Sequence, residues 1–301
     1  MNNRKLYAAP MEGLTGFAWR KAHQEVFGGA DKYFSPFVVA NQTHKFKTKE
    51  LRDLTQDEDN LIPQILTNKA EHFIWAAKEL KEMGYEEINF NLGCPSATVV
   101  TRGKGSGILR DTEKLDSMLG EIYEALPDMK ISVKTRIGFE DKAEWPAILD
   151  VYSRYPIHEL IIHTRLRSEF YEGNADREIF AETLLHTDIP LIYNGDVCSN
   201  INEDWNLMAG RGLLKDPALF RKMAGGKDAS KEELIHFHDE LVRLYSSYMS
   251  GDGPVIHHMK SLWVYWGESF EYDERVMKKL KKAKSMSEYM MTASEILKGW
   301  D

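Results

Sequence analysis

The chain has 301 residues, of which 43% are hydrophobic and 29% are charged, and its formal net charge is -8. This composition excludes a disordered or fibrous protein, and the length allows one large domain with a smaller one. An acidic chain needs a local basic patch if it binds nucleic acid. Because the chain has two cysteines and no run of about 20 apolar residues, we expect a reduced, cytoplasmic protein without a membrane span.

Short apolar runs followed by polar or glycine-containing loops recur up to about residue 210, and amphipathic segments separate most of them. The runs expected to be strands are residues 6–9, 33–37, 62–66, 88–91, 131–134, 160–163, 191–193 and 207–209. The clearest helices are expected at residues 69–83 and 113–125, which Gly84 and Pro127 end. Strands that alternate with helices in this way predict an α/β protein with a closed parallel TIM (β/α)8 barrel.

The strand pattern stops at about residue 230, and helical segments continue to the end of the chain. We therefore expect a barrel domain over residues 1–225 and a small all-helical domain over residues 230–301. One connection in the barrel is short, because only CSNINEDWN, residues 198–206, separates the last two strands. A crossover helix with its loops needs roughly a dozen residues, so either the seventh helix is reduced to a turn or residues are missing.

The carboxyl ends of the strands in a parallel barrel meet at one mouth, and each predicted strand ends in polar or glycine residues. The residues collected in this way include Pro10, Met11, Gln64, Asn91, Cys94, Lys134, Arg136, His163, Arg165, Asn194, Gly195, Asp196, Gly210 and Arg211. The glycines of the last two loops favour a phosphate site over plain turns, because they let backbone N–H groups approach an anion closely.

Three of these side chains have competing interpretations. Lys134 is either a solvated lysine at a strand end or a cation that stabilises a reduced flavin. Gln64 needs a hydrogen-bond partner in its buried strand, and we favour the pyrimidine edge of a flavin over a backbone carbonyl of the barrel. His163 is either a core histidine or a site residue, and Arg165 two positions later favours the site.

Cys94 lies between Gly93 and Pro95, just after an apolar run, where the regular structure is expected to end. A buried, inert thiol is usually found within a strand or a helix. The position in a loop therefore favours a reactive cysteine over an inert one.

The residues of the mouth, in this order, resemble those of the tRNA-dihydrouridine synthases, flavoenzymes that reduce a uracil ring in tRNA. The matching segments are APMEGLTGFAWR (9–20), NFNLGCPSATVVTRGKGSGIL (89–109), ISVKTRIG (131–138), HTRLRSEFYEGNAD (163–176), YNGDV (193–197), MAGRGLLKDPALF (208–220) and, in the helical tail, HHMKSLWVYW (257–266). One departure is Glu12, where the family more often has alanine.

The resemblance implies FMN as the cofactor, NADPH as the reductant and Cys94 as a general acid. The residues implied to hold FMN are Pro10, Met11, Gln64, Lys134, His163, Asn194, Gly195, Asp196, Gly210 and Arg211. Reduction of the C5=C6 bond needs hydride at C6 and a proton at C5, and a thiol with a pKa near ~8.5 is largely protonated at neutral pH. Asn91 is expected to bind the uracil edge, and no metal is expected.

A uridine inside folded tRNA must be flipped out to reach the mouth, at a cost of a few kcal/mol that backbone contacts have to offset. The segment RVMKKLKKAK, residues 275–284, has six positive and no negative charges. It is either a solvated helix face or a phosphate-binding surface, and we favour the latter. The residues assigned to tRNA are Lys278, Lys279, Lys281 and Lys282, with Arg136, Arg165, Arg167, Tyr171 and Lys104 near the mouth.

Two other functions are open at this point. One is a flavin barrel that reduces a small free pyrimidine or an enone, against which the basic segment argues. The other is a non-catalytic tRNA-binding protein that has lost its flavin through the shortened connection. We expect a monomer.

Overall fold

The computed structural model describes residues 4–55, 58–201, 204–267 and 273–299. Ten parallel strand segments form one sheet in the order β3-β5-β6-β7-β8-β9-β10-β1-β2-β4. Because β2 pairs with β4 while β3 pairs with β5, the two ends of this order meet and the sheet closes into a barrel. The segments are β1 Leu6–Ala8, β2 Lys32–Phe34, β3 Val38–Val39, β4 Leu61–Ile62, β5 Gln64–Leu66, β6 Glu87–Leu92, β7 Lys130–Arg136, β8 Leu160–His163, β9 Leu191–Asn194 and β10 Leu207–Ala209.

Two predicted strands are each divided into two segments, so the ten segments fill eight barrel positions. The predicted strand 33–37 corresponds to β2 and ends one residue before the second segment, β3, and the predicted strand 62–66 corresponds to β4 and β5. Pro36 and Pro63 lie at the two interruptions, and proline has no N–H to donate to a neighbouring strand. The barrel prediction is confirmed, whereas the continuity of these two strands was wrong.

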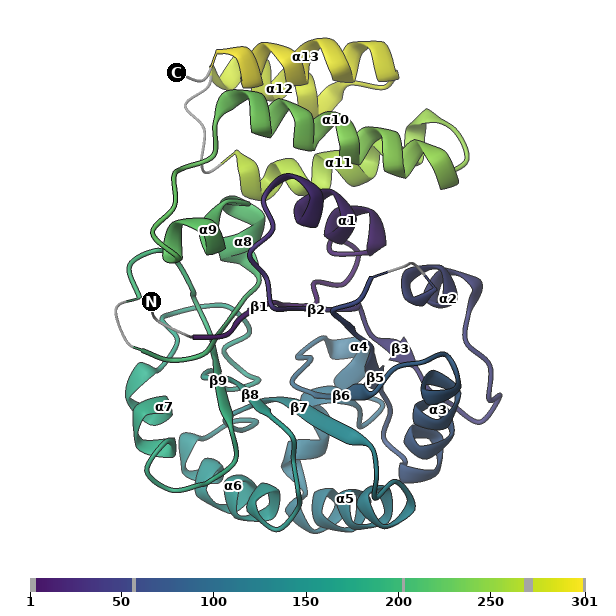
Figure 1. The fold of residues 1–301 in the computed structure, drawn as a ribbon, viewed down its shortest axis with the longest axis vertical. Coiled ribbons are helices and arrows are strands. Elements are labelled where there is room, and N and C mark those ends of the chain that lie inside the picture. The colour runs from purple at the N-terminus through teal and green to yellow at the C-terminus, as the bar shows by residue number, and fades with distance from the viewer. Residues whose placement is uncertain (1–3, 56–57, 202–203, 268–272, 300–301) are drawn as a thin grey trace.

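In Figure 1, α3, α5, α6 and α7 surround the strands in the lower part of the molecule, and α1, α8 and α9 lie between the strands and the C-terminal helices. The predicted helices 69–83 and 113–125 are confirmed as α3 and α5. The full set is α1 Phe17–Val26, α2 Thr48–Leu54, α3 Ala70–Glu82, α4 Ala97–Val100, α5 Thr112–Ala125, α6 Trp145–Ser153, α7 Arg177–Thr183, α8 Arg211–Lys215 and α9 Leu219–Met223, with short 3-10 turns at Gly105–Arg110 and Lys142–Glu144. A closed apolar layer fills the barrel interior, made of Tyr7, Ala9, Phe34, Ile62, Ile161, Ile192 and Met208.

The short connection between β9 and β10 contains no helix in its described parts, residues 195–201 and 204–206. Trp205 covers the barrel wall instead, since its ring lies 5.3 Å from that of Tyr193 and 4.9 Å from that of Phe180. The two strands keep their parallel register, with Leu207 opposite Tyr193. In its described parts the connection is therefore a turn, and the sheet keeps its order around it.

Four helices follow the barrel and lie above it in Figure 1: α10 Lys231–Tyr248, α11 Asp252–Trp266, α12 Glu274–Lys282 and α13 Met286–Lys298. Aromatic side chains join them to α1, with the ring of Phe237 at 5.3 Å from Phe27 and that of Tyr248 at 4.9 Å from Phe17. The predicted C-terminal helical region is thus present, and its first helix packs directly on the barrel.

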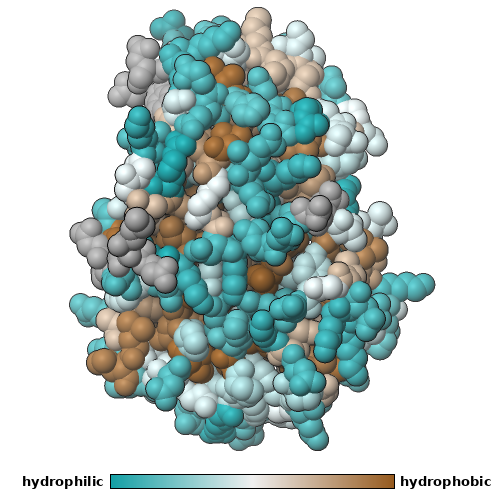
Figure 2. Space-filling view, viewed as in Figure 1, coloured by the Kyte–Doolittle hydropathy of each residue, from teal (hydrophilic) through white to brown (hydrophobic). Residues whose placement is uncertain are grey.

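Figure 2 shows a face that is largely hydrophilic, with apolar atoms gathered at the lower left around α7. Leu184 and Leu185, which follow α7, are 43% and 81% exposed. Within the described ranges, no helix combines the length and the apolar character that crossing a bilayer requires.

Candidate active site

Two adjoining cavities open at the carboxyl ends of the strands. The first has a volume of about 390 Å³ and is bounded by the loops after β8, β9 and β10. The second has a volume of about 330 Å³ and is bounded by the loops after β1, β2, β6 and β8, with residues of β5, β7 and α11. Both cavities are lined by Pro10, Met11, Lys134, His163 and Tyr171, so they form one continuous mouth.

The structure brings all the predicted cofactor residues to this mouth. Pro10, Met11, Lys134, His163, Asn194, Gly195, Asp196, Gly210 and Arg211 line the first cavity, and Gln64 lines the second. The loops after β9 and β10 touch each other at Gly212, where an added Cβ would lie 2.0 Å from the carbonyl oxygen of Val197. A side chain at this position would separate the two glycine loops, so the shortened connection has not displaced them.

Asp196 joins two arginines at the rim of the first cavity. Its Oδ1 accepts a hydrogen bond from Arg211 at 2.8 Å, and its Oδ2 accepts one from the buried Arg165. Burial by itself would raise the pKa of Asp196, but the hydrogen bond from Arg165 and the nearby charges lower it. The carboxylate is therefore ionised at neutral pH and holds both guanidinium groups at the cavity.

Lys134 lies near the carboxyl end of β7 and lines both cavities. It has no carboxylate partner among the described residues. Its Nζ donates a hydrogen bond to Asn194 Oδ1 at 2.7 Å, and Asn194 in turn donates to the carbonyl of Met208 at 2.8 Å. Burial, helped by the guanidinium of Arg136, lowers the pKa of Lys134 to about 7. A buried cation without an anion is suited to bind negative charge on a ligand.

His163 is buried at the end of β8 and is neutral. Burial and four nearby cations, beginning with Arg136, hold its pKa well below the usual value. Its Nε2 lies 3.2 Å from Arg165 Nη1, and because a guanidinium only donates, Nε2 accepts and the proton lies on Nδ1. His163 thus offers an N–H donor to the mouth.

Cys94 lies at the second cavity, in the loop between β6 and α4 that the sequence singled out. Ser106 fixes this loop, since its hydroxyl donates to the carbonyl of Cys94 at 2.8 Å and its N–H donates to the same oxygen at 3.1 Å. Gly105 allows this approach: it has φ +55°, and an added Cβ would lie 2.8 Å from that carbonyl. The position of the thiol is therefore set by the second half of the same loop.

The thiol of Cys94 is protonated at neutral pH. Burial raises its pKa, and this effect exceeds the opposing influence of a hydrogen bond at Ser96 and of the cations Arg136 and Lys134. A protonated thiol is a proton donor, not a nucleophile. The chemistry of the loop therefore agrees with the predicted general acid.

A chain of side-chain amides lines the floor of the second cavity. Asn91 Nδ2 donates to Gln64 Oε1, and Gln64 Nε2 donates to Asn89 Oδ1, both at 2.7 Å. The protein partners of Gln64 are therefore two asparagines of β6, not the backbone carbonyl considered as an alternative. The oxygen of Asn91 accepts from the N–H groups of Gly93 and Cys94 at 3.1 and 3.0 Å, so the amide chain also holds the cysteine loop.

The arginines near the mouth are engaged with the loop after β8. Arg136 is 1% exposed and donates to the carbonyls of Gly93, Leu166 and Phe170 at 2.7 to 3.1 Å. Arg165 is also 1% exposed and bonds Glu172 and Gly173. Arg167 lies outside both cavities and stacks on Phe139 and Phe170, while Tyr171 is 45% exposed and lines both cavities. Because Arg136 and Arg165 are buried, they can affect RNA binding chiefly by fixing the conformation of this loop.

The predicted basic segment forms α12, which does not line the mouth. Val276, Met277 and Leu280 are buried against the neighbouring helix α13, whereas Lys278, Lys279, Lys281 and Lys282 are exposed. The helix therefore presents its lysines to solvent from the helical region (Figure 1).

The second cavity has an apolar wall that was not predicted from the sequence. Phe37, from the loop before β3, Phe170, from the loop after β8, and Tyr265, from α11, line it together with Cys94. Tyr265 lies 56 residues beyond Ala209, the end of the last barrel strand, and only the resemblance of the tail segment hinted at it. Glu12, the departure from the family, also lines this cavity.

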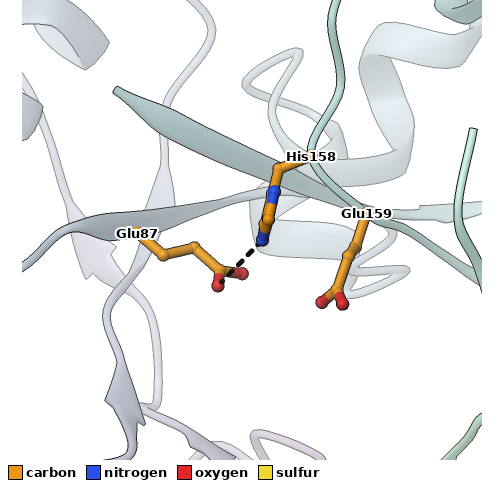
Figure 3. Close-up of side chains that lie close together, drawn as sticks. All are labelled: Glu87, His158 and Glu159. Atoms are coloured by element: carbon orange, nitrogen blue, oxygen red, sulfur yellow. Dashed lines mark ion pairs between the residues drawn. The ribbon is translucent and has the colours of Figure 1, made fainter. Parts of the chain in front are cut away.

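A group of metal-binding residue types lies at the opposite end of the barrel. Glu87, His158 and Glu159 come from the amino ends of β6 and β8 and point toward a common space (Figure 3). The ammonium of Lys32 lies 2.6 Å from Glu87 Oε2 and 2.8 Å from Glu159 Oε2. Because a lysine already supplies the positive charge between these carboxylates, the group is an ion-pair network of the scaffold.

Comparisons with known proteins agree with this geometry. The sequence model of a family described as dihydrouridine synthase matches residues 7–295. A probable tRNA-dihydrouridine synthase of Staphylococcus epidermidis is 31% identical over 273 residues, covering 84% of this chain and 81% of that protein. The probable tRNA-dihydrouridine synthase 2 of Bacillus subtilis is 28% identical over 256 residues, covering 79% and 75%.

Among solved structures, a variant of NCR from Zymomonas mobilis superposes with a TM-score of 0.53 at 11% identity, covering 75% of this chain and 88% of that one. At this identity the likeness concerns the fold alone, and it agrees with the barrel. The family match extends over nearly the whole chain and includes the loop of Cys94 and both glycine loops. The chain belongs to the dihydrouridine synthase family.

Proposed function

We propose that this protein reduces the C5=C6 bond of uridines in tRNA to 5,6-dihydrouridine, with FMN as cofactor and NADPH as reductant. One observation carries the proposal: a protonated thiol, Cys94, and an unpaired buried cation, Lys134, line the same 330 Å³ cavity. A proton donor beside a site for negative charge is the pair that reduction of a ring conjugated to carbonyls requires.

The residues of the mouth fit FMN. Lys134 and His163 line both cavities, whereas Arg211, Gly195 and Gly210 line only the first cavity. This order suits a ligand with a ring system at one end and a phosphate at the other. When bound, FMN supplies the hydride for C6 of the uracil and accepts electrons from NADPH.

The protein's own groups have separate roles in the proposed reaction. Lys134 stabilises negative charge on the flavin ring, and binding of that charge restores the ammonium form that burial disfavours. Cys94 donates its proton to C5, and the Sγ thiolate that remains is reprotonated from solvent. Asn91 orients the base and holds the cysteine loop at the same time.

The helical region is proposed to hold the tRNA. We divide the chain into a catalytic barrel, residues 1–225, and a tRNA-binding part, residues 230–301, with the exposed lysines of α12 as phosphate contacts. Phe37, Phe170 and Tyr265 offer flat apolar surfaces to a flipped base. A tRNA substrate also implies that the protein works in the cytoplasm.

A reductase of small free pyrimidines or enones is the second candidate. It needs the same flavin cavity, but it gives no role to Tyr265, which brings the helical region into the cavity wall. The third possibility, a tRNA-binding protein without flavin, conflicts with the intact contact of the two glycine loops at Gly212.

The visible absorption spectrum of the purified protein separates these three functions. For the proposed synthase, we expect a flavin spectrum that bleaches with NADPH under anaerobic conditions and returns only when tRNA lacking dihydrouridine is added. Return with free uridine or an enone, but not with tRNA, would establish the small-molecule reductase. Absence of flavin even after FMN is supplied would contradict both enzymatic functions.

A further inference from the structure

A second basic surface lies on the barrel itself, away from α12. It consists of Lys45, Lys47, Lys49, Lys69, Arg102 and Lys104, which we call the basic rim. These residues come from three segments: the β3–α2 connection with the first turn of α2, the turn before α3, and the loop that follows Cys94. In Figure 1 the β3–α2 connection runs along the right-hand side, beside α3.

The β3–α2 connection is anchored so that its lysines face outward. The ring of His44 stacks on that of Trp75 of α3 at 5.0 Å, and the ring of Phe46 packs on the same indole at 4.9 Å. Lys45 and Lys47 flank Phe46 and are exposed, as the alternation of an extended segment requires. His44 also adopts a left-handed φ of 47°, which its contact with the indole maintains. The contacts with Trp75 therefore fix the β3–α2 connection, and Lys45 and Lys47 are exposed on its outer side.

The three segments meet at one surface. The amide of Asn68 donates to the carbonyl of Arg102 at 2.8 Å, which ties the turn before α3 to the cysteine loop. Burial lowers the pKa of Lys104, and the charges of Arg102 and Lys47 lower it further. Cations from the first and third segments are thus close enough to repel one another.

The positive charge of the rim is incompletely balanced. Lys47, Lys49 and Lys69 form ion pairs with Glu50, Glu12 and Glu71 at 3.8, 3.7 and 3.2 Å, and the lysines are 58–70% exposed. Exposed pairs of this length contribute little. Lys45, Arg102 and Lys104 form no ion pair within the described part of the chain. A surface of this kind on a chain with a net charge of -8 is suited to an anionic partner.

The basic rim borders the candidate substrate cavity. Lys49 pairs with Glu12, and Glu12 lines the cavity that contains Cys94. Lys104 lies in the same loop as the thiol, ten residues further along the chain. A polyanion bound on the rim would therefore run directly past the cavity opening.

We propose that the basic rim binds the phosphate backbone next to the flipped uridine, so that tRNA is held by the barrel as well as by α12. The proposal rests on the proposed function and adds a second, separate phosphate surface to it. The rim would position the strand that carries the target base, whereas α12 would hold a more distant part of the tRNA.

The test compares three proteins with their flavin in place: wild type, the rim variant Lys45→Gln/Lys47→Gln/Arg102→Gln, and a matched control, Lys78→Gln/Lys81→Gln/Lys130→Gln. The control removes the same charge, from exposed sites near the other end of the barrel. Affinity for an unmodified tRNA transcript is measured between 50 and 200 mM KCl. Each phosphate contact contributes roughly 0.7–0.9 to the slope of log K against log salt.

For the rim variant we expect a slope smaller by about two to three, with weaker binding at low salt, and an unchanged rate of flavin bleaching by NADPH. The control should keep the wild-type slope, and Lys45→Arg/Lys47→Arg should keep most of the affinity. Equal slopes for the rim variant and the wild type would overturn the proposal. An equal loss of affinity for heparin and for tRNA would also overturn it, because the rim would then be a general polyanion surface.

These outcomes are independent of the proposed chemistry. If wild-type protein forms no dihydrouridine, the proposed function fails, whatever the salt slopes are. If the wild type is active and the rim variant keeps both its slope and its kcat/KM for tRNA, only the inference about the rim fails.

Discussion

The two ends of the barrel each hold a partly buried lysine, and the surroundings of these lysines are opposite. At the amino ends of the strands, Lys32 lies between the carboxylates of Glu87 and Glu159. Burial favours its neutral form, but the carboxylates outweigh burial and raise its pKa. At the mouth, Lys134 bonds the neutral amide of Asn194, and burial lowers its pKa to about 7.

This difference distinguishes the amino ends of the strands, which are structural, from the candidate site at the carboxyl ends. At the amino ends of the strands both carboxylate oxygens of Glu159 are hydrogen-bonded, since they accept from Lys5, Lys32 and the hydroxyl of Tyr7 at 2.7 to 3.0 Å. At the mouth, none of the described residues supplies an anion to pair with the ammonium of Lys134. The ion pairs at the amino ends of the strands therefore belong to the scaffold, whereas the carboxyl ends can bind a charged ligand.

The largest effect should come from removing the thiol at the mouth. For Cys94→Ala we expect dihydrouridine formation in a single turnover to fall by about 10²–10⁴-fold, because the ring loses its proton donor. The free energy of unfolding and the rate of flavin bleaching by NADPH should stay at wild-type values. Cys198→Ala, at the exposed cysteine, is the matched control and should keep the wild-type rate. Unchanged product formation in Cys94→Ala would remove the thiol as the acid.

The corresponding change at the opposite end should affect stability and not chemistry. Glu159→Leu leaves Lys32 with one carboxylate and the buried hydroxyl of Tyr7 without its acceptor. We expect a loss of about 3–5 kcal/mol in the free energy of unfolding, measured with urea. The double variant Lys32→Met/Glu159→Leu should lose less than the sum of the two single variants. A loss below about 1 kcal/mol for the single variant would show that the network is not structural.

The pH dependence of stability should distinguish the two lysines. The unfolded chain holds the proton of Lys134 up to a pKa near ~10.4, whereas the folded chain releases it near about 7. Between these values the unfolded state binds more protons, so stability rises with pH, by at most ~1.4 kcal/mol per pH unit. In flavin-free protein, Lys134→Met should be more stable than wild type at pH 7, and the difference should shrink toward pH 10. A difference that is constant over this range would contradict the lowered pKa.

The smallest effect should come from an exposed ion pair at the scaffold end. Lys130 lies 3.3 Å from Glu86, and the two side chains are 54% and 85% exposed. Lys130→Ala should change the free energy of unfolding by less than about 1 kcal/mol, in urea titrations run beside Glu159→Leu. A loss as large as that of Glu159→Leu would mean that the exposed fraction of an ion pair does not determine its contribution to the free energy of unfolding.

Much of the mouth could be predicted from the sequence because its residues follow strands directly. An apolar run that ends in Asn-Gly-Asp or in Gly-Arg-Gly places those residues at the carboxyl end of a strand, wherever the strand lies in the barrel. The same reasoning located Cys94 between two residues that end regular structure. It did not locate Tyr265, because a residue of α11 reaches the cavity only through the packing of the helical region on the barrel.

The local amino-acid sequence thus determined the strand and helix pattern, the glycine loops, the cysteine loop and the basic segment of α12. Each of these features depends on residues that are close together in the chain. The tertiary structure alone decided which charges meet. Lys134 and Lys32 are both lysines of parallel strands, yet their pKa shifts are opposite: burial in the folded barrel lowers the pKa of Lys134, whereas the carboxylates of Glu87 and Glu159, distant in sequence, raise that of Lys32. Electrostatic energies depend on the distance between charges in space and on burial, and neither can be read from the order of the residues.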